Sequence, residues 1–97
     1  MRPSADDVRA FSQSLDPAFA ENVSRWDVRV GEDHWGDPAI FVTAVLKDSH
    51  AHRAWGTLRG FEQRLFRALL ERHPEYFPFV LFSAESEALD PLVPVKA

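Results

Sequence analysis

The sequence predicts an α+β fold, a single two-layer domain in which a three-stranded sheet is covered by one long helix. Three segments alternate apolar residues with period two, which is the pattern of strands. A longer segment between the second and third of them repeats apolar residues with the period of a helix. No repeat or linker divides the 97 residues, so we expect one domain over residues 1–97.

Two short helices are expected near the N-terminus. Ser4 is a good cap for a helix from about Ala5 to Ser14, whose apolar residues recur at helical spacing. Asp16 followed by Pro17 marks a second start, because aspartate caps a helix and proline suits its first position. This second helix is predicted over residues 17–22.

Two strands joined by a hairpin are expected next. Residues 23–30 alternate apolar and charged side chains, which is typical of a strand with one wet face. Residues 31–38 are dense in turn formers and close the hairpin. Residues 39–47 are apolar on both alternating sides, so we expect both faces of this strand to be covered.

The long helix is predicted from about His52 to His73. Its main apolar stripe consists of Leu58, Phe61, Leu65, Ala68 and Leu69. Trp55, Phe66 and Leu70 form a second arc beside that stripe. Together the two arcs span roughly 200°, about twice the ~100° that a helix needs to pack on a sheet. The second arc therefore predicts an interaction surface.

The third strand is predicted over residues 76–83. Pro78 cannot donate a hydrogen bond to a neighbouring strand, so this strand is expected at an edge of the sheet. From about residue 84 the chain becomes acidic and then proline-rich, which indicates an extended C-terminal tail over 84–97. The element order is α-(α)-β-β-α-β, with the strands on either side of the long helix running in the same direction. The pattern leaves the strand order in the sheet open.

This order of elements looks like the small cytoplasmic domain of cation-efflux transporters. The stretch from Ser49 to His52 is similar to the histidine-bearing helix start of that family, although residues 79–82 offer no ligand where the family has one. Less closely, the order resembles a bacterial type of KH domain, which has a Gly-x-x-Gly between two helices. Here Gly56 and Gly60 are four apart within one predicted helix, a spacing that permits close helix approach. We assign the chain to neither family.

The best metal candidates are His34, Asp48, His50 and His52, because imidazole and carboxylate ligands suit zinc or a similar ion. His50 and His52 share a face only in extended geometry, and here they lie on either side of a helix start. A structural zinc site also needs four ligands at fixed spacing. We therefore interpret these residues as solvated cap and loop residues, and expect no metal or other cofactor.

Catalysis is not expected either. Asp33 and His34 beside Trp35 resemble an acid/base pair, but a third group and a pocket are missing from the pattern. The chain has no nucleophile elbow, no phosphate-binding glycine loop and no His-Glu-x-x-His helix. We interpret Asp33 and His34 as turn residues and expect Trp35 to fold back on the hairpin.

Composition lowers the expectation of several partners. The net charge of −4 disfavours nucleic acid, although five arginines on the long helix give that helix a local positive excess. We interpret the arginines as a solvated face that is also able to meet an acidic surface. No apolar run approaches the roughly 18 residues of a membrane span, and cysteine is absent. No membrane partner is expected, and a cytoplasmic location is the default.

The function expected from these patterns is that of a small, non-catalytic protein–protein interaction or dimerisation module. Its partner would be a second copy or another protein, bound through Trp55, Phe66 and Leu70. Two alternatives stay open. One is a metal- or ligand-responsive regulatory domain, and the other is an accessory protein that neutralises a partner toxin.

Overall fold

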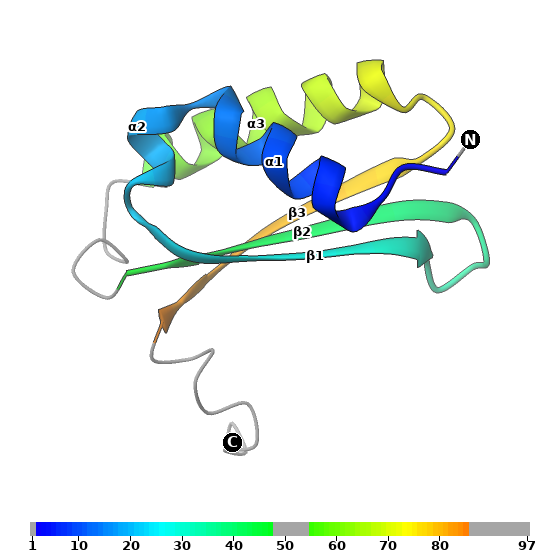
Figure 1. The fold of residues 1–97 in the computed structure, drawn as a ribbon, viewed down its shortest axis with the longest axis horizontal. Helices are drawn as coiled ribbons and strands as arrows, with labels where there is room; N and C mark the ends of the chain where they lie inside the picture. The colour runs from blue at the N-terminus through cyan, green and yellow to red at the C-terminus, as the bar shows by residue number, and fades with distance from the viewer. Residues whose placement is uncertain (1, 48–54, 86–97) are drawn as a thin grey trace.

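A computed structural model describes residues 2–47 and 55–85, with side chains placed for all of them except residues 55 and 56. The elements are α1 (Ala5–Leu15), α2 (Pro17–Ala20), β1 (Val23–Glu32), β2 (Pro38–Leu46), α3 (Trp55–Arg72) and β3 (Phe77–Ala84). The three strands form one mixed sheet, and the helices lie together on one side of it (Figure 1). The predicted α+β class, with a three-stranded sheet and a long helix, is confirmed.

Both predicted helix caps are present. The Ser4 hydroxyl accepts the Asp7 N–H at 3.0 Å, and the Asp16 carboxylate accepts the Phe19 N–H at 3.1 Å. Asp16 also accepts a hydrogen bond from the Arg64 guanidinium at 2.9 Å, which ties α2 to α3. The Arg64 and Phe19 bonds lower the pKa of Asp16, because both stabilise the charged carboxylate. One arginine of the long helix therefore meets an acidic group of its own fold.

The sheet has the strand order β1-β2-β3, so the strand that is apolar on both sides is the central one. β1 pairs antiparallel with β2, with Val28 opposite Val42. β2 pairs parallel with β3, with Val42 opposite Val80. The edge position predicted for β3 from Pro78 is confirmed.

The hairpin between β1 and β2 is tighter than predicted, because β1 continues to Glu32 and β2 begins at Pro38. The Asp33 carboxylate organises the turn by accepting the N–H groups of Trp35 at 2.8 Å and Asp37 at 3.0 Å. The Trp35 side chain is 82% exposed, so the expectation that it folds back on the hairpin is wrong. Its ring meets His34 edge to face at 5.1 Å.

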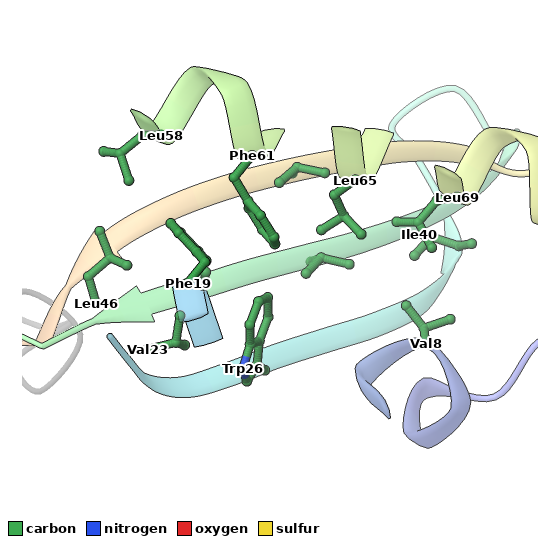
Figure 2. Packing of buried hydrophobic residues seen from close by; sticks show 13 residues of the cluster. Val8, Phe19, Val23, Trp26, Ile40, Leu46, Leu58, Phe61, Leu65 and Leu69 are labelled. Atoms are coloured by element: carbon green, nitrogen blue, oxygen red, sulfur yellow. The ribbon is translucent and has the colours of Figure 1, made fainter. Parts of the chain in front are cut away.

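The core lies between the sheet and the helices, as Figure 2 shows. Phe61, Leu65 and Leu69 of α3 are fully buried, which confirms the predicted main stripe of that helix. The Phe19 ring stacks on Phe61 at 4.0 Å between centroids, so α2 is held against α3 by an aromatic pair. Val8 of α1 is also fully buried and closes the core over β1.

We expect Gly60→Ala to stabilise the protein. A Cβ built at Gly60 meets no atom of the described residues within 4 Å, so within the described part of the chain no element approaches closely at this residue. Alanine should raise the free energy of unfolding by about 1 kcal/mol, since glycine costs that much inside a helix. The midpoint of a thermal scan followed by circular dichroism should rise by about 4–8 °C. Gly36→Ala is the control and should lower it, because Gly36 has a φ of 85°.

Candidate interaction surface

One side of the sheet faces away from the helices (Figure 1). The register places side chains of all three strands on it. We call it the open face and define it by Arg25, Asp27 and Arg29 of β1, Phe41 and Thr43 of β2, and Phe77, Phe79 and Leu81 of β3. Phe77 is 48% exposed and Leu81 is 56% exposed. The apolar pattern of β2 predicted that both sides of the sheet are covered, but the helices of the described chain cover only one side. Ala39 and Val45 of β2 lie on the same side of the sheet as Phe41 and Thr43 and are nevertheless buried.

The aromatic side chains of the open face pack against one another, and these contacts fix their orientation. The rings of Phe41 and Phe79 are stacked, with centroids 5.0 Å apart and planes 10° apart. Phe77 meets Phe79 edge to face at 5.0 Å, and the Arg29 guanidinium lies 4.1 Å above the Phe41 ring. These contacts hold the rings in place without a partner, so a partner would lose less side-chain entropy on binding them.

A groove of about 710 Å³ continues the open face around β3 toward α3. Phe66 and Leu70 of the second arc line it together with Phe77 and Leu81 of β3. Phe66 touches the Phe77 ring edge to face at 5.5 Å, and Leu70 is 36% exposed. The structure thus brings two of the three predicted surface residues together. Trp55 is the first residue of α3, and its side chain lies outside those described.

The outer edge of β1 is closed by two arginines from the N-terminal segment. Arg2 donates to the Val30 carbonyl at 2.7 Å, and Arg9 donates to the Trp26 carbonyl at 3.4 Å. These carbonyls point away from β2, where an added strand would bind. Covering them is a known way to keep an edge strand from pairing with another chain.

The outer edge of β3 is blunted by its proline. The Asp33 N–H donates to the Asp37 carbonyl at 2.8 Å, and hydrogen-bonded pairs recur at every second residue of an antiparallel ladder. The backbone N–H and C=O groups of Val42 therefore point toward β3. Those of its partner Val80 point away from β2, toward the outer edge of the sheet. Pro78 shares the orientation of Val80 and has no N–H to offer. The open face is thus a better association surface than either edge.

The predicted metal candidates are not brought together in the described part of the chain. His34 is exposed in the hairpin, while Asp48, His50 and His52 lie outside the described residues. Among residues 2–47 and 55–85, no three His, Asp or Glu side chains form a group that could hold a metal ion. Asp33, the other half of the suggested acid/base pair, instead accepts hydrogen bonds within the turn.

The sequence pattern did not predict that side chains of β3 belong to the interaction surface. Both alternating sides of this strand are apolar, so the pattern does not show that Phe77, Phe79 and Leu81 face away from the helices. One usable signal was the charged row of β1. The hairpin register places Phe41 beside Arg29 on the wet side, and the parallel register then places Phe79 beside Phe41.

Comparison with known proteins gives no match: no family model, no curated protein and no solved structure is similar to this chain. Within the residues that the structure describes, none of the helices combines the length and the apolar character needed to cross a membrane. The open face and its groove are the features from which a function can be argued.

Proposed function

We propose that this protein is a small, non-catalytic interaction module that associates, with itself or with another protein, through the open face and the adjoining groove. The observation that carries the proposal is the exposure of Phe77 and Leu81, at 48% and 56%, on the side of the sheet away from the helices. Contiguous exposed apolar side chains of this kind mark association surfaces. The proposal keeps the cytoplasmic location expected from the sequence.

The energetic argument rests on large side chains that are already ordered. Fully burying an exposed leucine or phenylalanine side chain contributes roughly 1.5–3 kcal/mol. Leu70, Phe77 and Leu81 are 36%, 48% and 56% exposed, so burying the rest of each contributes about half of that per copy toward the entropy lost on association. Phe41 and Phe79 add a stacked pair whose rotamers are fixed in the free protein. This support is concentrated on β3 and the neighbouring flank of α3.

The two alternative functions differ in what they require. A metal- or ligand-responsive domain would need His34 to act with Asp48, His50 and His52, and of these only His34 is described. An accessory protein that neutralises a partner toxin is a special case of association and would use the same surface. The experiment below therefore tests the shared property, which is binding through the open face.

Leu81→Asp is expected to abolish association. The substitution removes an exposed leucine from the open face and places a carboxylate where the partner would exclude water. Losing about half of the burial energy of a leucine, together with the cost of removing the carboxylate from water, should weaken binding by about 100-fold. Fluorescence-detected sedimentation velocity should show the labelled wild type in a species larger than the 11.1 kDa chain, either purified or in a clarified extract of the source cells. The variant should sediment as the single chain in both.

Trp35→Ser is the matched control, because it removes a larger and more exposed apolar side chain from the hairpin, away from the open face. It should sediment like the wild type. The proposal is wrong if the wild type is a single 11.1 kDa species in both settings, or if Leu81→Asp leaves the larger species unchanged. Circular dichroism of each variant verifies that the fold is intact.

A further inference from the structure

We infer that the open face receives a second copy of this chain, packed face to face about a two-fold axis that crosses the strands at the level of Val28, Val42 and Val80. In this arrangement Asp27 of each copy meets Arg29 of the other. The inference rests on the proposed function, since it names the partner and the geometry of the same surface. The distribution of charged and apolar side chains over the open face supports it.

The open face has a charged side and an apolar side. Its β1 row carries only charged side chains, in the order Arg25, Asp27 and Arg29, while β3 carries Phe79 and Leu81. The register places Asp27 and Leu81 at one level of the sheet and Arg29 and Phe79 at the next exposed level. β2 lies between the two sides, with Phe41 and Thr43. A partner must therefore present charges opposite β1 and apolar area opposite β3.

A second copy meets this requirement in one of two symmetric ways. A two-fold axis along the strands would place β1 of one copy on β3 of the other, and would bury the Arg25–Asp27 ion pair and Arg29 against Phe79 and Leu81. Moving charged side chains out of water onto an apolar surface is costly, even when two of them are paired. An axis across the strands places β1 on β1 and β3 on β3. The charged side of one copy then contacts the charged side of the other, and the apolar side contacts the apolar side. An isologous contact of this second type is the commonest form of dimer.

The charges of β1 also select the level of that axis. An axis at the level of Asp27 would oppose two aspartates, and an axis at the level of Arg29 would oppose two arginines. An axis at the level of Val28, between them, opposes Asp27 to Arg29 twice. Arg25 then lies opposite Gly31 of the second copy, where the Arg29 guanidinium is 3.6 Å from the position a Cβ of Gly31 would take. Arg25 therefore gains no carboxylate across the axis and keeps Asp27 of its own copy, to which it donates two hydrogen bonds of 3.0 Å.

The same level suits the apolar side. Rotation about the Val80 level brings Leu81 of one copy onto Phe79 of the other, twice. An axis two residues away, at the level of Phe82, would also oppose Arg25 to Asp27 but would bring Leu81 onto Ser83. Stacked sheets keep their strands within about 30° of one another, so residues next to the axis keep these partners. The level of Val28 therefore satisfies both sides of the face.

The area of the open face determines the protein concentrations at which dimerisation should be measured. Three strands at ~4.8 Å spacing, with roughly seven residues each at ~3.3 Å, cover about 330 Å² of projected area per copy. Even with the α3 flank, this lies at the low end of specific interfaces, where association is weak. Sedimentation equilibrium should therefore span about 1–500 μM, which corresponds to the weak binding of small interfaces.

Charge reversal tests the geometry. Asp27→Arg and Arg29→Asp should each weaken the homodimer about 10-fold or more, because each places two pairs of like charges across the axis. The double variant Asp27→Arg with Arg29→Asp should recover to within a few-fold of the wild type. An equimolar mixture of the two single variants should form a heterodimer, since an arginine then opposes an aspartate on both sides of the axis. Both residues are exposed, and the Arg25–Asp27 ion pair that Asp27→Arg removes is a weak surface pair, so thermal scans of the single variants should stay close to the wild type.

Each contrary result overturns a defined part of the picture. If the single variants dimerise like the wild type, or their mixture forms no heterodimer, the copies do not meet as inferred, while loss of association in Leu81→Asp still upholds the open face. If the purified wild type is a monomer at about 500 μM, the second copy is not the partner. The proposed function itself fails if the larger species is also missing from the cell extract, or if Leu81→Asp leaves that species unchanged.

Discussion

Phe61→Ala is expected to lower the free energy of unfolding by about 3–5 kcal/mol, the range for removing a large aromatic side chain from a core. Phe61 is fully buried at the centre of an aromatic cluster. Its ring stacks on Phe19 at 4.0 Å and lies 6.1 Å from Trp26 and 6.5 Å from Phe82, so one truncation weakens contacts to α2, β1 and β3 together. A domain of this size is stable by about 5–15 kcal/mol, so the loss is a large fraction of the total. Urea unfolding measures it.

The matched control is Phe77→Ala, which removes the same atoms from a residue that is 48% exposed. Its cost should be only about 1–2 kcal/mol, because about half of its area stays exposed in the single chain and the rest contacts Phe66 and Phe79. Similar losses for the two variants would contradict the assignment of the core to the helix side of the sheet. Both should be measured at low protein concentration, since association adds to apparent stability.

Much of the fold could be predicted because the relevant signals are local. Ser4 and Asp16 cap their helices through hydrogen bonds to residues three positions later, and this spacing is visible in the sequence. The period of α3 identified Phe61 and Leu65 as core residues, since a helix packed on a sheet must present one stripe to it. Pro78 indicated an edge strand by lacking a donor.

The rest depends on contacts between distant segments. The extent of the hairpin was underestimated, because the pairing of Glu32 with Pro38 is set by the whole ladder and not by the turn formers alone. The exposure of Trp35 follows from a turn that the Asp33 carboxylate organises, which the composition of the loop does not reveal. The orientation of Phe79 depends on the register of β3 against β2, which long-range packing determines.

Phe79 and Val80 are neighbours on β3 whose side chains lie on opposite faces of the sheet, and of the two alanine substitutions only Phe79→Ala should therefore change association. Phe79→Ala removes half of the stacked pair with Phe41 from the open face. Phe79 is only partly exposed in the single chain, so each copy loses roughly 0.5–1 kcal/mol of further burial, and because the change is present twice in a two-fold dimer, association should weaken about 10-fold. The free energy of unfolding of the single chain should also fall, by about 1–2 kcal/mol, because Phe79 packs on Phe41 and Phe77.

Val80→Ala should change the stability of the chain and not its association. Val80 is buried against the helices, so its truncation should lower the free energy of unfolding by about 2 kcal/mol and leave the dissociation constant nearly unchanged. Sedimentation equilibrium gives the dissociation constant of each variant, and urea unfolding at low concentration gives the stability of the separate chain. If Val80→Ala weakened association as much as Phe79→Ala, β3 would not divide an internal core from an external surface. A change in the dissociation constant from Phe79→Ala alone would show that one strand serves folding on one face and association on the other, as the register of the sheet requires.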